Sequence, residues 1–145
     1  MRKIDRSTLV PYSSREMFRL VDDVESYPDF LPWCSDAVIE RQEGDTIVAT
    51  LELHKGGMTK RFTTRNTRNP YSAIDLALVG GPFRSLAGGW RFRDLGEEGC
   101  RVSLELAFAF DSRLVDMVFG PFFEDICKSL VDAFTRRAEE VYGSR

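Results

Sequence analysis

The apolar pattern of the chain changes from a period of two to a helical period at residue 111, and this change restricts the fold more than any other feature. Residues 101–110 alternate strictly, which predicts a long strand with one bulky apolar face. After an Asp111-Ser112 cap, apolar residues recur at helical spacing as far as Val141, which predicts the longest helix. Because both apolar surfaces must be buried, we expect this helix to pack on the sheet face that carries Phe108 and Phe110.

The dipeptide Gly120-Pro121 interrupts the helical pattern. Proline has no N–H group, and its ring clashes with the carbonyl group four residues earlier in a helix. We therefore expect a kink or a split at this point, beside the phenylalanines of the same segment.

Shorter alternating segments upstream predict further strands, at residues 4–12, 46–53, 58–66, 74–78 and 83–94. Ser13 to Glu16 offers the cap of a helix after the first of them. Gly88-Gly89 inside the last segment predicts a bulge or a sharp bend. This order predicts a single α+β domain over residues 1–145, with a curved antiparallel sheet of about six or seven strands around the C-terminal helix.

Composition restricts the class of protein. The chain has 145 residues, 43% hydrophobic and 30% charged, and is long enough for one core. Its apolar stretches are too short to cross a bilayer, and because its first residues have no apolar segment followed by a cleavage site we expect no export. Cys34, Cys100 and Cys127 are too scattered for a disulfide framework or a zinc knuckle. We expect a soluble cytoplasmic protein.

Residues that commonly carry catalysis are scarce. The one histidine, His54, lies beside a predicted hairpin turn, and the glycine pairs lack the lysine and hydroxyl of a phosphate-binding loop. Only Tyr12, Thr64 and Asn66 offer polar groups toward the predicted interior. We therefore expect no enzymatic activity, no metal site and no required cofactor.

Many aromatic side chains face the predicted interior; each of them can simply fill the core, but together they permit a cavity. A sheet bent around one helix can leave an apolar space where the side chains do not meet, and such spaces commonly bind small molecules. We expect a hydrophobic ligand there. The candidate ligand-binding residues are Phe30, Leu31, Trp33, Phe62, Leu76, Phe83, Trp90, Phe92, Leu106, Phe108, Phe110, Phe119, Phe122, Phe123 and Ile126.

Four arginines alternate with these residues and therefore face outward: Arg61, Arg65, Arg91 and Arg93. Two interpretations stay open. Cross-strand ion pairs with outward carboxylates such as Glu52, Asp75 and Glu105 would neutralise them. Alternatively, they form a basic patch that contacts the phosphates of ribosomal RNA.

Several segments resemble the START-like coenzyme-Q-binding proteins of the polyketide cyclase/dehydrase-like superfamily, most closely their bacterial ribosome association toxin (RatA) branch. The matching segments lie at residues 7–13, 24–34, 62–66, 81–83, 88–92 and 133–138, and the Tyr27-Pro28-Asp29-Phe30-Leu31-Pro32 stretch is the most specific of them. The resemblance implies a helix-grip (START/Bet v-like) fold with a hydrophobic tunnel between the sheet and the last helix.

For function, the resemblance implies two alternatives. The first is noncatalytic binding of a lipid such as ubiquinone or another polyprenyl quinone, in support of respiratory electron transport. Residues 27–34 would then form a lid, and the protein would contact the inner membrane transiently from the cytoplasm. The second is a toxin that binds the large ribosomal subunit and blocks its association with the small one. The identity of the lipid, the antitoxin partner and the oligomeric state stay open.

Overall fold

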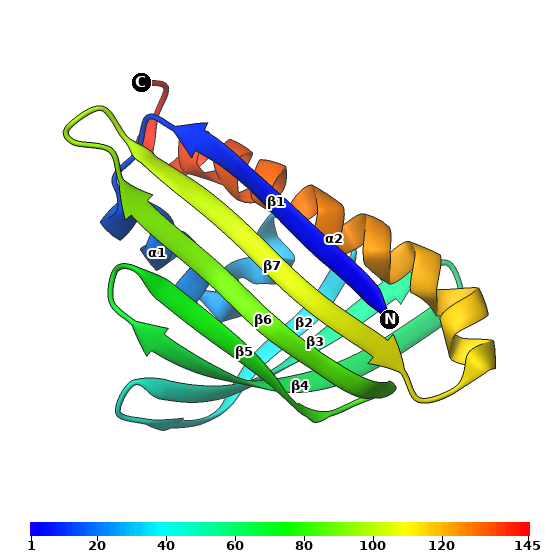
Figure 1. Cartoon of the computed structure of the whole chain (residues 1–145). Helices are drawn as coiled ribbons and strands as arrows, with labels where there is room; N and C mark the ends of the chain where they lie inside the picture. The colour runs from blue at the N-terminus through cyan, green and yellow to red at the C-terminus, as the bar shows by residue number, and fades with distance from the viewer.

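The computed structural model describes all residues from Met1 to Arg145. Seven strands form one antiparallel sheet in the order β1-β7-β6-β5-β4-β3-β2 (Figure 1). Their bounds are β1 Arg2–Val10, β2 Cys34–Glu43, β3 Thr46–Lys55, β4 Met58–Asn69, β5 Ala73–Gly80, β6 Phe83–Asp94 and β7 Cys100–Phe110. Only β1 joins the sheet out of chain order, beside β7. The other strands are linked by hairpins.

The long helix α2, Arg113–Tyr142, lies along the sheet behind β1 and β7 (Figure 1). Its buried stripe includes Phe119, Phe123, Val131 and Phe134. The helix lies closest to β1 and β7, and its rings also contact Phe62 of β4 and Trp90 of β6. The predicted α+β helix-grip architecture is thereby confirmed. None of the helices combines the length and the apolar character needed to cross a lipid bilayer.

Helix α1, Ser14–Asp22, begins where the sequence predicts. The Ser13 hydroxyl accepts a hydrogen bond from the Glu16 backbone N–H, and the Glu16 carboxylate accepts one from the Ser13 N–H. This reciprocal capping box satisfies two backbone donors that the first helical turn leaves free. A short 3₁₀ helix, η1, follows at Val24–Asp29 and ends just before β2. Together α1 and η1 close one end of the grip (Figure 1).

Of the kink or split expected at Gly120-Pro121, the split is wrong, because α2 is continuous there; Figure 1 shows its first turns at an angle to the rest, as a kink predicts. Arg2 from β1 spans this point. Its guanidinium lies 3.0 Å from an Asp116 carboxylate oxygen and 3.4 Å from one of Glu124. A Cβ atom at position 120 would lie 2.7 Å from Arg2 Nη2, so the glycine makes room for this arginine.

Of the bulge or sharp bend predicted at Gly88-Gly89, the bulge is wrong. Pairing between β6 and β7 runs without a shift from Ala87 to Asp94, and the irregularity lies instead between Phe83 and Ser85. The two glycines instead let neighbouring strand backbones come close together. Gly88 has a φ of +142°, and a Cβ there would lie 2.0 Å from the Glu105 carbonyl oxygen. The bent sheet therefore brings two backbones closer than a side chain allows.

Candidate functional site

An apolar pocket lies between the concave face of the sheet and α2. The centre of a water-sized molecule can move through a volume of about 80 Å³ inside it. A cavity that holds one water has roughly 10–15 Å³ of such volume. Its wall consists of 21 residues, 18 of them hydrophobic: Val21, Asp22, Val24, Tyr27, Trp33, Ala49, Leu51, Leu53, Phe62, Thr64, Asn66, Ile74, Leu76, Leu86, Trp90, Leu106, Phe123, Ile126, Cys127, Leu130 and Phe134. The space suits a compact apolar group.

The polar members of the wall are Asp22, Thr64 and Asn66. Thr64 and Asn66 are buried, and the Thr64 hydroxyl donates to Asn66 Oδ1 across 2.7 Å. Asp22 is held by Arg68, whose Nη1 lies 3.1 Å from its carboxylate. No lysine, arginine or histidine lines the pocket. Its only charged wall residue is therefore an acid that already has a partner.

The segment predicted as a lid, residues 27–34, lies at this pocket but contributes only part of its length to the wall. Tyr27 and Trp33 line the space, and the Tyr27 hydroxyl donates to the Val21 carbonyl oxygen. Burial raises the pKa of Tyr27 far above its ordinary range, so the hydroxyl keeps its proton as a donor. Leu31 packs instead in a separate small cluster with Val24 and Ile47.

Seven of the predicted ligand residues line the pocket: Trp33, Phe62, Leu76, Trp90, Leu106, Phe123 and Ile126. Eight do not, namely Phe30, Leu31, Phe83, Phe92, Phe108, Phe110, Phe119 and Phe122. That the first group binds a ligand stays a prediction.

Most residues of the second group fill space by packing on one another. The rings of Phe83 and Phe110 stack with centroids 4.9 Å apart, and Phe108 meets Phe123 edge-on at 4.9 Å. Phe119 joins the same cluster, which fills one end of the grip. Phe30 packs on Phe134, Phe92 packs on Phe18, and half-buried Phe122 lies under the Lys55 ammonium.

Sequence reasoning missed much of the remaining wall. Ala49, Leu51 and Leu53 occupy alternate positions of β3, a pattern that already placed them on one face. Positions 123, 126, 127, 130 and 134 form one stripe of α2 at helical spacing, which also predicts a common direction. Val21, Asp22 and Val24 carry no such signal, because their position depends on how α1 and η1 turn back over the sheet.

The thiols of all three cysteines are buried. Burial raises the pKa of Cys34 to about 11 and that of Cys100 to about 12, and it raises the pKa of Cys127 in the pocket wall as well. His54 is exposed on the β3–β4 hairpin, with its Nδ1 3.2 Å from Thr59 Oγ1. These thiols stay protonated near neutral pH and serve as small apolar groups.

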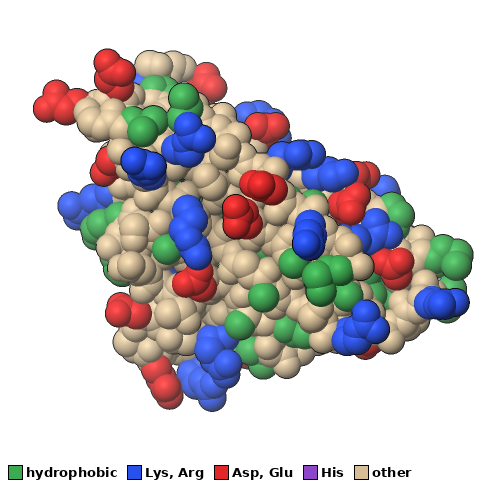
Figure 2. Space-filling view, viewed as in Figure 1, with side chains coloured by type: hydrophobic (Ala, Val, Ile, Leu, Met, Phe, Trp, Pro, Cys, Tyr) green, Lys and Arg blue, Asp and Glu red, His purple; other side chains and the backbone are tan.

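The four predicted arginines share the outer face of the sheet, which is the face seen in Figure 2. Two of them are ion-paired: Arg61 lies 2.7 Å from Glu52, and Arg91 lies 2.8 Å from Asp75. Arg65 and Arg93 form no ion pair, and Arg93 lies opposite Arg101 in register. Cross-strand pairing therefore accounts for two of the four arginines.

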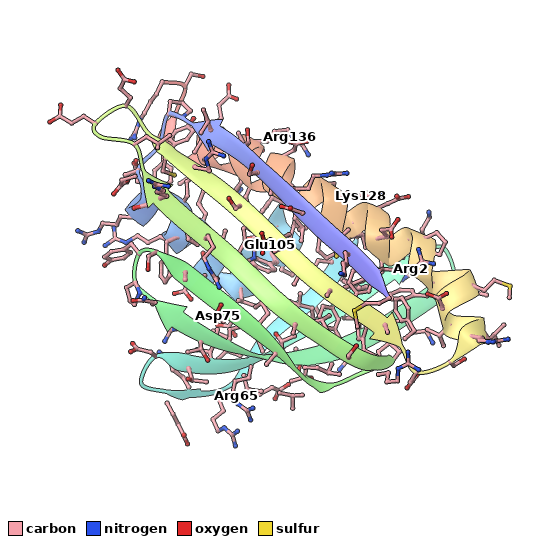
Figure 3. All side chains as sticks on the ribbon, in the orientation of Figure 1. Arg2, Arg65, Asp75, Glu105, Lys128 and Arg136 are labelled. Carbon is pink, nitrogen blue, oxygen red and sulfur yellow. The ribbon has the colours of Figure 1, made fainter.

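Acidic side chains divide the basic residues of this face. Gly89 lies in register with Asp75 on one side and Glu105 on the other, so these two carboxylates form a row across three strands (Figure 3). Arg65 lies in the adjacent row, next to Ala77. Figure 2 accordingly shows basic and acidic groups interspersed, with no continuous basic patch.

Comparison with known proteins assigns the fold and the family. Residues 10–135 match the family described as "Polyketide cyclase / dehydrase and lipid transport". The chain is 44% identical to the ribosome association toxin RatA of Vibrio cholerae over 143 residues, which cover 99% of both chains. It is 27% identical to the mitochondrial coenzyme Q-binding protein homolog B of Xenopus laevis, covering 94% of this chain and 58% of that one.

Among solved structures, the Zhui aromatase/cyclase of a Streptomyces species superposes with a TM-score of 0.86 over 99% of both chains, at 17% identity. At that identity the likeness concerns the fold alone. The sequence match over residues 10–135 and the near full-length match to the toxin are independent of it. The chain belongs to the START-like polyketide cyclase/dehydrase and lipid transport family, in the branch that includes the ribosome association toxins.

Proposed function

We propose that the protein acts without catalysis, as a ribosome-directed toxin of the RatA type that binds the large ribosomal subunit and blocks its association with the small one. The observation that carries this proposal is the 44% identity to the Vibrio cholerae toxin over 99% of both chains. This function ranks above quinone binding in support of respiration, because the coenzyme Q-binding relative is more distant, at 27% identity.

The outer sheet face supplies the candidate contact surface. Arg65 and Arg93 are exposed and free of carboxylate partners, so they can pair with phosphate oxygens without first breaking an ion pair. Arg61 and Arg91 would have to exchange Glu52 and Asp75 for phosphates. The proposed contacts are therefore two separate points of this face, Arg65 and, with Arg101 beside it, Arg93, because the row of Asp75 and Glu105 lies between them.

Co-sedimentation with purified large subunits tests the function and the surface separately. The wild-type protein should pellet with the subunits, and binding should weaken as salt rises. The double variant Arg65→Glu/Arg93→Glu should lose this binding, whereas Arg113→Glu/Arg136→Glu, which makes the same charge change on exposed positions of α2, should retain it. If the wild-type protein does not pellet with the subunits, the function is contradicted. If the Arg65→Glu/Arg93→Glu variant binds as well as the Arg113→Glu/Arg136→Glu control, only the surface is contradicted.

A second function is favoured by a separate observation, the apolar pocket. Its wall of 18 hydrophobic residues and few polar groups is suited to a neutral hydrophobic ligand, and a polyprenyl quinone is the class that the coenzyme Q-binding relative's name suggests. The cavity volume of about 80 Å³ has room for a ring-sized group. A long prenyl tail would therefore have to leave the pocket or displace side chains. Ligand binding and ribosome binding use opposite faces of the sheet and are compatible.

Solvent extraction of the natively purified protein, followed by mass spectrometry, tests the ligand proposal. A stoichiometric lipid or quinone supports it. An empty extract, together with no uptake of quinone on titration, contradicts it.

A lipid ligand also implies transient contact with a membrane, and the start of α2 offers a candidate surface. Leu114, Met117 and Val118 are 68%, 71% and 56% exposed on successive turns. Flotation with lipid vesicles should carry the wild-type protein upward, and the triple change of these residues to serine should abolish this. Flotation that is absent in the wild-type protein contradicts the membrane contact.

A further inference from the structure

Asn66 is the one polar side chain of the pocket wall that is both deeply buried and incompletely hydrogen-bonded. It lies on the inner face of β4 and is 8% exposed, among neighbours that are almost all hydrophobic. Its carboxamide oxygen accepts a hydrogen bond from the Thr64 hydroxyl across 2.7 Å, and Thr64 occupies the preceding inner position of the same strand. This bond fixes the orientation of the amide group.

With its oxygen turned to Thr64, the Asn66 amide presents its nitrogen to the pocket. The nitrogen donates to no protein group, whereas the oxygen is paired. The structure contains no fully enclosed side-chain nitrogen or oxygen without a partner, so this nitrogen can be reached by a water-sized molecule, and Asn66 itself lines the pocket. A buried amide donor is costly to leave unpaired, and water or a ligand atom has to satisfy it.

The charges around the pocket restrict the ligand further. The wall holds no cation that could pair with a carboxylate, and the Arg68 guanidinium is already engaged by Asp22 and by the carbonyl oxygens of Gly44 and Asp45. An anionic ligand would enter a desolvated space beside the Asp22 carboxylate. Such burial of an unpaired charge is strongly unfavourable.

From these observations we infer that Asn66 selects the ligand of this pocket: a compact, neutral, apolar molecule with a carbonyl oxygen that accepts the Asn66 N–H. Pure hydrocarbons leave the donor unpaired, and free fatty acids bring a charge with no counter-ion. This inference rests on the proposed hydrophobic-ligand function and names the chemical class and the residue that recognises it. Asn66 is thus a specificity-determining residue.

Three probes of similar size test the inference by equilibrium dialysis: dimethylnaphthoquinone, dimethylnaphthalene and naphthoate. The methyl groups occupy both open quinone carbons, which prevents addition of the Cys127 thiol in the wall. One neutral hydrogen bond corresponds to about fivefold to tenfold in affinity. The wild-type protein should therefore prefer the quinone over the hydrocarbon by about that factor, and naphthoate should bind weakest.

Asn66→Leu removes the donor and replaces the amide with an apolar side chain of similar size. The variant should bind the quinone about fivefold to tenfold more weakly and should bind the hydrocarbon at least as well as the wild-type protein. Thr63→Val is the matched control, because Thr63 neighbours Thr64 but bonds Thr50 on the outer face. This control should leave both affinities unchanged.

The outcomes separate the inference from the function beneath it. If the wild-type protein binds none of the probes, the hydrophobic-ligand function fails and the inference falls with it. If it binds the quinone and the hydrocarbon equally, or naphthoate best, the ligand function stands and the role of Asn66 is refuted. The wild-type comparison alone decides this point, even where Asn66→Leu fails to fold.

Discussion

Arg68 Nη1 lies 3.1 Å from a carboxylate oxygen of Asp22, and this ion pair joins the end of α1 to the inner face of β4 at the edge of the pocket. The same guanidinium donates to the carbonyl oxygens of Gly44 and Asp45 in the β2–β3 turn. The Arg68 and Asp22 side chains are only 17% and 24% exposed. One arginine therefore holds three segments together around one side of the pocket.

Replacing Asp22 with asparagine should destabilise the protein measurably. The change leaves a shielded guanidinium without its counter-ion, which should lower the free energy of unfolding by about 2 kcal/mol. Urea denaturation measures the loss. The control is Asp75→Asn, which breaks the Arg91 pair in which both side chains are 56% exposed and should cost less than about 1 kcal/mol. Equal losses in the two variants would contradict the structural role given to Arg68.

The sequence predicted six of the seven strands, and β2 shows why the last was not separated. Strand β2 carries register shifts between Cys34 and Asp36 and between Ile39 and Arg41, which break the alternation that identifies a half-buried strand. Its second half is exposed and polar. Lying at the edge of the sheet beside β3 alone, it needs no continuous apolar face.

The sequence predicted which side chains point inward, but not which of them line the pocket. Alternation correctly turned Phe62, Trp90 and Phe108 inward, yet Phe108 packs against other rings and lies outside the wall. Whether inward side chains meet across the grip depends on the distance between sheet and helix, and the pattern of one chain does not contain that distance. The Thr64–Asn66 pair was identified as polar and inward, but its hydrogen bond required coordinates.

Gly88→Ala tests the close approach between β6 and β7. The new methyl carbon would lie 2.0 Å from the Glu105 carbonyl oxygen, at a φ of +142° that disfavours any side chain. The free energy of unfolding should fall by about 3 kcal/mol or more, or no folded protein should form. Gly57→Ala is the control, because the β3–β4 turn is open there and its φ is ordinary. A variant Gly88→Ala as stable as Gly57→Ala would refute the proposed crowding.

The buried thiols predict a loss of stability at alkaline pH. Their pKa is raised by burial from 9.0, to about 11 for Cys34 and about 12 for Cys100, so the unfolded chain releases these protons first as the pH rises. The stabilisation is complete below pH 9 and is lost between pH 9 and the raised values. The urea midpoint should therefore fall between about pH 9 and pH 10, before tyrosines ionise extensively. The variant Cys100→Ala should show a smaller fall; an equal fall would show that this thiol does not contribute.

Filling the pocket should separate the two proposed functions. Ala49 lies in the wall on the inner face of β3, and Ala49→Leu would place three more carbons in the cavity of about 80 Å³. We expect this variant to lose uptake of dimethylnaphthoquinone, with a stability change within about 1–2 kcal/mol, because the added group occupies an existing void. Ribosome co-sedimentation should persist, since Arg65 and Arg93 lie on the opposite face. Ala77→Leu makes the same change on the outer face beside Arg65 and should leave quinone uptake intact. Loss of ribosome binding in a folded Ala49→Leu variant would instead mean that the pocket controls the outer surface, because the substitution touches no outer residue directly.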